Sequence, residues 1–231
     1  MNIKQKITIA IDGFSSSGKS TLAKDLSEEL GYTYLDSGAM YRAVTLYCLE
    51  NRIDISNISQ VKQALQSITL YIPPANDKTF AIHLNDRDVT DLIRSMEVSN
   101  SVSEVAAISE VRTFLVALQQ QAGASGGIVM DGRDIGTVVF PKAELKLYVD
   151  SPLSIRAKRR YNELVSKGLD VTLDDVTHNL MHRDHIDSNR ADSPLKKAKD
   201  AFIIDNTNLN RSDQLKLAVK LTQEKLDELS K

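Results

Sequence analysis

The sequence contains very little cysteine, little net charge and no long apolar run. Cys48 is the only cysteine among 231 residues, so no internal disulfide can form, which suits a reducing compartment. The formal net charge of −2 gives no broadly basic surface for nucleic acid. No apolar run approaches membrane-spanning length, and the N-terminal M-N-I-K-Q-K leads straight into a strand-like segment, without room for a signal peptide. We therefore predict a cytoplasmic protein that binds neither nucleic acid nor membrane.

Internal repeats and low-complexity tracts are also missing from the sequence. The content of 42% hydrophobic and 26% charged residues is ordinary for a globular protein. A length of 231 residues suits one α/β domain with insertions, so we expect a single domain over residues 1–231.

The most informative motif lies near the N-terminus. The run I7-T8-I9-A10-I11 reads as a buried strand, G13-x-x-x-x-G18-K19-S20 follows it, and Leu22, Leu26 and Leu30 then recur at helical spacing. In such a loop the backbone N–H groups surround phosphate oxygens, the lysine reaches the β- and γ-phosphates, and the serine hydroxyl can bind Mg²⁺. The alternative, a chance glycine–serine turn, explains neither the strand before the loop nor the helix after it.

Strand-like and helix-like segments alternate along the rest of the chain. Strands are expected at 32–35, 126–131, 145–150 and 201–205. Helices are expected at 39–51, 97–122 with a break near Ser109, 152–167, 172–185 and 211–229. This alternation predicts an α/β fold, with a parallel sheet of the P-loop NTPase type and helices on both of its faces.

The region from 67 to 91 has a different pattern. Short alternating runs are separated by turn residues such as P73-P74 and N85-D86. This pattern predicts an antiparallel β-meander, and we expect a small β-rich insert over residues 62–95.

A phosphate-binding loop alone leaves ATPases, GTPase switches and kinases open. The GTPase interpretation is weak because no N-K-x-D element follows a later strand, and N206-T207-N208-L209 lacks its lysine and acid. Asp131 ends an apolar strand and is the natural carboxylate to bind Mg²⁺ through water, together with Ser20. The alternative role for Asp131 is to cap the turn that follows.

The arginines favour a phosphate as the acceptor of a transferred phosphoryl group. Arg133 follows Asp131, Arg42 lies in a predicted helix, and Arg183 and Arg190 are expected two turns apart on one helix face. An alcohol acceptor needs a carboxylate to take its proton, whereas a phosphate acceptor needs cations that hold two anions together. A solvated charged surface remains the alternative for each arginine taken singly, but it explains the whole set poorly.

Four segments together resemble one known family. They are the loop G-F-S-S-S-G-K-S-T at 13–21, L-D-S-G-A-M-Y-R at 35–42, D-G-R-D-I-G-T-V-V-F-P at 131–141, and R-D-x-x-D-x-x-R at 183–190. In order and spacing they are similar to the bacterial cytidylate kinases, members of the nucleoside monophosphate kinases. The resemblance covers essentially the whole chain, and the 131–141 segment is specific to this group.

The resemblance implies phosphoryl transfer from MgATP to CMP or dCMP, by a monomer whose partners are these small nucleotides and whose cofactor is Mg²⁺. It implies a lid over residues 156–170 and metal binding by Ser20 and, through water, Asp131. The implied ATP-binding residues are Gly13, Phe14, Ser15, Ser16, Ser17, Gly18, Lys19, Ser20, Thr21, Arg159 and Arg160. The implied catalytic residues are Lys19, Asp131, Arg133, Arg183 and Arg190. We expect Lys19 to be exposed at the mouth of the loop.

The resemblance also implies a set of CMP-binding residues. Those near the acceptor phosphate and sugar are Ser37, Arg42, Arg133 and Arg190, and those that hold the sugar hydroxyls are Arg183 and Asp187. Tyr41 belongs to the set without a more specific role. The residues implied to read cytosine are Ser103, Arg112 and Asp134. A carboxylate can accept from the N4 amino group of cytosine, whereas uracil would face Asp134 with an oxygen.

Three alternatives remain open at this stage. The acceptor could be UMP or another monophosphate, or the protein could be a slowly hydrolysing regulatory switch. His178, His182 and His185 have helical ligand spacing, but a solvated helix face explains them better than a metal site does. Cys48 lies among apolar helix residues, and we expect it to fill the core.

Overall fold

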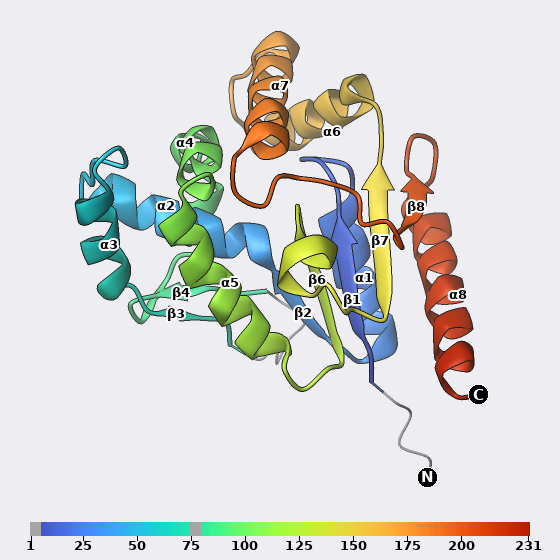
Figure 1. Cartoon of the computed structure of the whole chain (residues 1–231). Coiled ribbons are helices and arrows are strands. Elements are labelled where there is room, and N and C mark those ends of the chain that lie inside the picture. Colours follow the sequence, from blue (N-terminus) through green and yellow to red (C-terminus); the bar gives the residue numbers. More distant parts are fainter. Residues whose placement is uncertain (1–5, 74–79) are drawn as a thin grey trace.

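A five-stranded parallel sheet forms the centre of the computed structural model, which describes residues 6–73 and 80–231 (Figure 1). Its strands are β1 (Thr8–Asp12), β2 (Thr33–Asp36), β6 (Ile128–Gly132), β7 (Leu145–Asp150) and β8 (Phe202–Asp205). They lie in the order β2-β6-β1-β7-β8, and neighbouring strands pair in parallel. The predicted parallel sheet is confirmed.

The helices are α1 (Lys19–Leu30), α2 (Ser37–Glu50), α3 (Ile58–Gln66), α4 (Met96–Ala106), α5 (Ser109–Gly123), α6 (Leu153–Ser166), α7 (Leu173–Asn189) and α8 (Arg211–Leu229). Of these, α1 and α8 pack on one face of the sheet, and α5 packs on the other. Two short turns complete the list, a 3₁₀ turn η1 (Leu92–Arg94) and a π-helical turn η2 (Ile135–Val139). The predicted helix break near Ser109 separates α4 from α5. No helix in the described part of the chain has the length and apolar character needed to cross a membrane.

The alternation of side chains along β1 divides the core into two layers. Ile9 and Ile11 pack with Leu22 of α1 and with residues of α8 on one face of the sheet. Ala10 faces the other way and packs with Met130, in a cluster that includes residues of η2. A strand buried on both faces needs apolar residues at every position, which explains the unbroken apolar run in the sequence.

The insert contains the antiparallel sheet that the sequence predicts, with shorter strands. They are β3 (Leu70–Tyr71), β4 (His83–Leu84) and β5 (Arg87–Asp88). Asn85 and Asp86 join β4 to β5 with φ values of 49° and 65°, as a tight two-residue hairpin requires. The expected meander also includes residues 74–79, which lie outside the described residues.

Helix α3 is a feature that the sequence interpretation left without an assignment. Its first turn is capped by the Asn57 side chain, which accepts hydrogen bonds from the backbone N–H groups of Ser59 and Gln60. Val61 and Ala64 are the buried residues of this helix, and the helix packs against α5. The asparagine cap was the sequence signal for it.

Helices α6 and α7 pack together through their own small core. It includes Ala157 and Leu164 of α6 and Val176 and Leu180 of α7. The expected lid over residues 156–170 therefore corresponds to most of α6 and the turn after it.

The end of α7 differs from the expectation. The helix stops at Asn189, and Arg190 has extended backbone angles, φ −59° and ψ 143°. The expectation that Arg183 and Arg190 share one face of one helix is therefore wrong. The chain turns back here because the Leu195 N–H donates to the Asp187 carbonyl at 2.7 Å, and the guanidinium of Arg190 donates to the Ser193 carbonyl.

Asp12 joins the end of β1 to the loop that follows β6. Its two carboxylate oxygens accept hydrogen bonds from the backbone N–H groups of Ile135 at 2.7 Å and Gly136 at 2.8 Å. The side chain is buried, and this burial raises the pKa of Asp12 to about 7. These two bonds hold the loop after β6, which carries Arg133 and Asp134. Asp12 therefore fixes the position of this part of the site.

We expect Asp12→Ala to lower the free energy of unfolding by about 2–6 kcal/mol, because two buried N–H groups would lose their acceptor. The measurement is urea unfolding followed by circular dichroism. Asp205→Ala is the matched control, since Asp205 also ends a strand and accepts from a backbone N–H, that of Thr207 at 2.9 Å, but at an exposed position. Equal losses in the two variants would contradict the role given to Asp12.

Candidate active site

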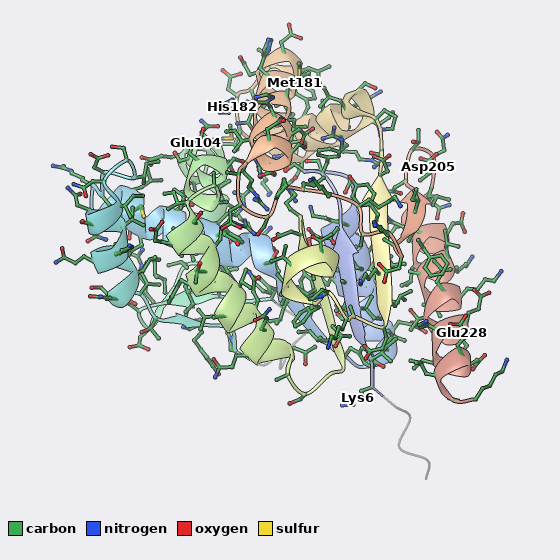
Figure 2. All side chains as sticks on the ribbon, in the orientation of Figure 1. Lys6, Glu104, Met181, His182, Asp205 and Glu228 are labelled. Carbon is green, nitrogen blue, oxygen red and sulfur yellow. The ribbon has the colours of Figure 1, made fainter. Side chains whose placement is uncertain are left out.

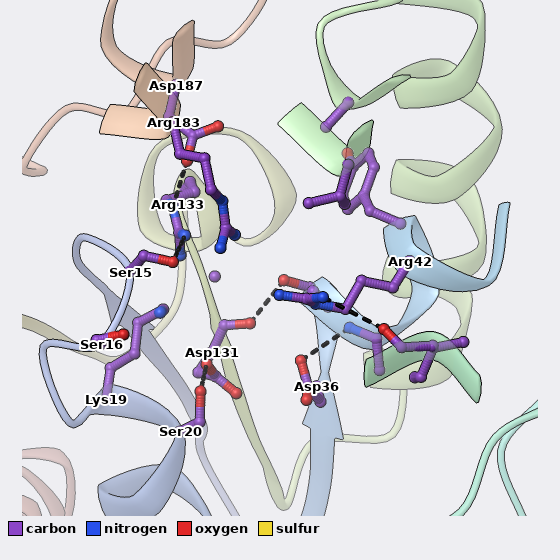
Figure 3. Close-up of a pocket in the computed structure, with 18 of the residues that line it drawn as sticks. Ser15, Ser16, Lys19, Ser20, Asp36, Arg42, Asp131, Arg133, Arg183 and Asp187 are labelled. Carbon is purple, nitrogen blue, oxygen red and sulfur yellow. Dashed lines mark hydrogen bonds and ion pairs between the residues drawn. The ribbon is translucent and has the colours of Figure 1, made fainter. Parts of the chain in front are cut away.

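A cleft of about 680 Å³ opens at the carboxyl ends of β1, β2 and β6. Its walls come from the loop before α1, the first turns of α2, one side of α4, the 131–134 segment, α6 and α7. Figure 3 shows side chains from these elements pointing toward one central space. In a parallel sheet the carboxyl ends of strands lie on one edge, so residues far apart in sequence meet there.

Two glycines shape the loop between β1 and α1. A side chain at Gly13 would place its Cβ 2.3 Å from the Val149 carbonyl oxygen, and one at Gly18 would lie 2.3 Å from Asn206 Nδ2. Gly18 also has a φ of +98°, which favours glycine. The loop can therefore pack tightly against β7 and the end of β8 while its backbone faces the cleft.

Only part of the predicted ATP-binding set lines the cleft directly. The residues that do so are Ser15, Ser16, Gly18, Lys19, Ser20, Thr21, Arg159 and Arg160. Phe14 lies 5.0 Å from the Arg156 guanidinium, measured from its ring centre, and the Ser17 carbonyl accepts from Asn206 at 2.6 Å. Phe14, Ser17 and Gly13 therefore fix the shape of the loop from behind.

Lys19 is buried, with 6% of its surface exposed, so the expectation of an exposed lysine is wrong. Its ammonium group donates to the Phe14 carbonyl at 3.3 Å. Burial, reinforced by the nearby positive charge of Arg133, lowers the pKa of Lys19 to about 7. The lysine side chain therefore folds back onto its own loop, a conformation that the motif alone does not predict.

Asp131 lies beside Lys19 and Ser20 as predicted. Its Oδ2 accepts a hydrogen bond from the Ser20 hydroxyl at 2.6 Å, and its Oδ1 accepts one from the Tyr34 hydroxyl at 2.9 Å. Burial, together with the negative charge of Asp36, raises the pKa of Asp131 to about 6. The Ser20 hydroxyl and the Asp131 carboxylate in contact form an oxygen-only set of the kind that suits Mg²⁺.

Three arginines converge on the centre of the cleft (Figure 3). Arg133 Nε donates to Asp187 at 2.7 Å, and Arg42 Nη1 donates to the Ser99 hydroxyl at 3.0 Å. Arg183 Nε is buried and has no hydrogen-bond partner among the described residues. Burial is the main cause that lowers the pKa of Arg42 to about 10 and of Arg183 to about 9, and neighbouring arginines add to it.

The residues predicted to read the base form a buried group at one end of the cleft. The Asp134 carboxylate is paired with Arg112 through Oδ2 and with Arg190, at 3.4 Å, through Oδ1. Tyr41 and Ser103 also line the cleft, and the buried Tyr41 hydroxyl has no hydrogen-bond partner within residues 6–73 and 80–231. Arg112 does not line the cleft, because it lies behind Asp134 with only 2% of its surface exposed.

The remaining predicted residues also reach the cleft. Ser37 lines it and donates its hydroxyl to the Asp131 carbonyl at 2.6 Å. Asp187 lines it from α7 and is buried against Arg133, and these contacts keep the pKa of Asp187 below its ordinary value although burial opposes them. Of the predicted residues, Gly13, Phe14, Ser17 and Arg112 pack behind the cleft, and the others line it.

Several contributors were not predicted from the sequence. Arg156 of α6 donates to the Ser15 carbonyl at 3.3 Å and pairs with Asp184 of α7 at 2.8 Å. Asp36 caps α2 by accepting from the Ala39 N–H at 2.9 Å. Arg156 could have been found from its spacing, since it stands three residues before Arg159 on one helix face. Tyr34, which binds Asp131, gave no sequence signal.

The histidines and the cysteine have other surroundings. His182 Nε2 lies 2.8 Å from Glu104 Oε1, where α7 meets α4, and Figure 2 shows these two side chains close together. His178 Nδ1 lies 2.8 Å from the Asp174 carbonyl of its own helix. Cys48 is buried in the cluster formed by α2 to α5, which confirms its place in the core.

A phosphate loop that opens beside a group of buried arginines is the arrangement of P-loop kinases, and fold and site assign the protein to that class of phosphotransferases. The family model described as cytidylate kinase matches residues 9–224. A cytidylate kinase of Flavobacterium psychrophilum is 52% identical over 221 residues, which cover 94% of this chain and 98% of the relative. One of Carboxydothermus hydrogenoformans is 43% identical over 221 residues, with 96% and 99% covered. The chain belongs to the cytidylate kinase family.

Among solved structures, a shikimate kinase from Acinetobacter baumannii in complex with shikimate covers 97% of this chain, and the match covers 96% of that chain. Its TM-score is 0.49 and its identity 15%, a likeness too loose to argue from.

The lowered pKa of Lys19 predicts a pH dependence of nucleotide binding. Bound phosphates would raise this pKa again, so ATP should bind most tightly when Lys19 carries its proton. Between pH 7 and pH 9 the affinity for MgATP should fall as pH rises, by up to roughly tenfold per unit. Calorimetry at pH 8 in buffers of different ionisation enthalpy should show uptake of about one proton.

Lys19→Met is the control for this pH dependence. The variant should bind MgATP weakly and with little change between pH 7 and pH 9, because methionine does not titrate. A native protein whose affinity stays constant over this range would contradict a depressed pKa for Lys19.

Proposed function

We propose that this chain transfers the γ-phosphoryl group of MgATP to CMP or dCMP, giving ADP and CDP or dCDP for pyrimidine nucleotide metabolism. The observation that carries the proposal is the content of one cleft: a phosphate loop at one side, an arginine group at the centre and a buried acid–arginine pair at the far end. The names of its relatives in the family, cytidylate kinases, support the same acceptor.

The loop before α1 supplies the donor side. Its backbone would surround the β- and γ-phosphates, with Lys19 turning from the Phe14 carbonyl to these anions. Ser20 and Asp131 would hold Mg²⁺, Asp131 through water. When bound, the ion would supply positive charge that offsets the negative charge developing during phosphoryl transfer. Arg159 and Arg160 reach the cleft from α6 and would close over the nucleotide.

The arginines supply the acceptor side. Arg42, Arg133 and Arg183 would hold the acceptor phosphate in line with the donor and stabilise charge as the phosphoryl group moves. A phosphate acceptor needs no base to take a proton, which fits a centre where Asp131 is already bound to two hydroxyls. Arg183 and Asp187 would hold the sugar hydroxyls.

The far end of the cleft supplies base selection. Asp134 would accept a hydrogen bond from the cytosine amino group. Ser103 and Arg112, which lies behind Asp134, would complete the recognition of the base. The Tyr41 hydroxyl, which has no partner in the described part of the chain, offers a further polar contact. Arg190 pairs with both Asp134 and Asp187, so it would link base recognition to the phosphate end.

Further parts of the proposal concern organisation. Residues 1–231 would act as one kinase domain, with 62–95 as the acceptor-side insert and 156–170 as the lid. The protein would work as a monomer in the cytoplasm on free nucleotides. Each of these features is expected from the family to which the chain belongs.

An acceptor panel tests the proposed function. ATP, Mg²⁺ and each of CMP, dCMP, UMP, AMP and GMP are incubated with the protein, and ADP release is followed. CMP and dCMP should give rapid acceptor-dependent release. Preference for UMP would change the acceptor, and slow release independent of any acceptor would indicate the regulatory switch.

We predict that Asp134→Asn relaxes base choice. CMP would lose a charge-assisted hydrogen bond worth about 1.5–3 kcal/mol, while the amide can donate to uracil O4. The ratio of kcat/KM for CMP to that for UMP should fall roughly ten- to a hundredfold. Lys19→Met should lower both values alike and leave the ratio unchanged, and an unchanged ratio in Asp134→Asn would place base recognition elsewhere.

A further inference from the structure

We propose that Tyr34 is a positioning residue, whose hydroxyl holds the Asp131 carboxylate in the orientation required to bind the Mg²⁺ of MgATP. The inference rests on the proposed function, which places the ion at Ser20 and Asp131. It assigns a role in that site to a side chain on β2, outside the phosphate loop and outside the motif that contains Asp131.

The geometry leaves the carboxylate little freedom. Each of its oxygens has one hydroxyl donor: Oδ2 binds Ser20 at the start of α1, and Oδ1 binds Tyr34 at 2.9 Å. A carboxylate held at one oxygen can still turn about its last bond, whereas two donors from different elements fix its plane. An ion that meets Asp131 through a water depends on that plane, because the water takes its direction from the oxygen that holds it.

The Tyr34 ring is itself held in place. It lies edge-on to the Phe80 ring, with centroids 5.8 Å apart and planes at 61°, and both residues line the cleft. The tyrosine is half-buried on β2, the edge strand of the central sheet. A ring fixed from the side delivers its hydroxyl to one point, as a residue that orients another group must do.

The need for this donor follows from the neighbouring strand. Asp36 on β2 stands directly opposite Asp131 on β6 in the strand register, so two acids share one edge of the sheet. The Asp36 side chain is occupied by the Ala39 N–H at the start of α2. Repulsion from Asp36 would turn Asp131 away from it, and the Tyr34 hydroxyl, two residues earlier on the same strand, opposes that turn.

A purely structural role is the competing explanation, since a phenol near the core needs an acceptor. The two explanations differ in what removal of the hydroxyl changes. A structural hydroxyl would affect stability or every ligand of the cleft, whereas a positioning hydroxyl would affect the contribution of the metal alone. Tyr34→Phe removes the hydroxyl and keeps the ring and its contact with Phe80.

The experiment measures ATP affinity by calorimetry, first in EDTA and then with excess Mg²⁺, and the Mg²⁺ concentration that gives half-maximal turnover. In Tyr34→Phe the affinity in EDTA should equal that of the native protein. The half-saturating Mg²⁺ concentration should rise by about tenfold, as for other changes to groups that orient metal ligands. The value of kcat should recover at saturating Mg²⁺.

Tyr32→Phe is the matched control. Tyr32 also lies beside the sheet, but its hydroxyl accepts from the Ile7 N–H at 3.2 Å instead of binding an acid. This variant should keep the native Mg²⁺ requirement.

Three results would overturn the inference: an unchanged Mg²⁺ requirement in Tyr34→Phe, an equal loss of ATP affinity with and without metal, or loss of folding in that variant. A native protein that needs no divalent ion would instead show that the proposed metal site is wrong. The two failures are therefore distinguishable.

Discussion

The burial of several cations in one cleft is the constraint on which the rest of the structure depends. Burial, together with the positive charge of neighbouring arginines, lowers the pKa of Lys19 to about 7, of Arg42 to about 10 and of Arg183 to about 9. Such a group costs folding free energy until an anion enters. Two phosphorylated substrates would bring the negative charge that offsets this cost.

Carboxylates limit the cost without cancelling the charge. Asp187 pairs with Arg133, Asp184 with Arg156 and Asp134 with Arg112. Buried ion pairs of this kind contribute little net stability, since desolvation offsets their attraction, but they fix direction. They also attach α7 to α6 and to the loop after β6, because Asp184 pairs with Arg156 of α6 and Asp187 pairs with Arg133 of that loop. The position of the helix that covers the cleft thus depends on the charges inside the cleft.

The parallel sheet supplies the frame for this arrangement. Ser20 and Asp131 are 111 residues apart in sequence and meet at 2.6 Å because β1 and β6 are neighbours that end on one edge. Asp12 ties that edge to the next loop through two backbone N–H groups. A different strand order would separate the phosphate loop from the arginines. The chemistry of the site therefore depends on the topology of the sheet.

The sequence by itself determined the features that have a local physical cause. The apolar run of β1, the glycines of the phosphate loop and the leucine spacing of α1 each act within a few residues, and the parallel sheet follows from their alternation. Motif order also identified the arginines and acids of the cleft. Tertiary structure alone decided how these groups pair: the burial of Lys19, the place of Arg112 behind Asp134, the end of α7 before Arg190, and the Tyr34 hydroxyl on Asp131. Each of these depends on contacts between segments far apart in the chain, where burial and neighbouring charge act together, and no local pattern records such contacts.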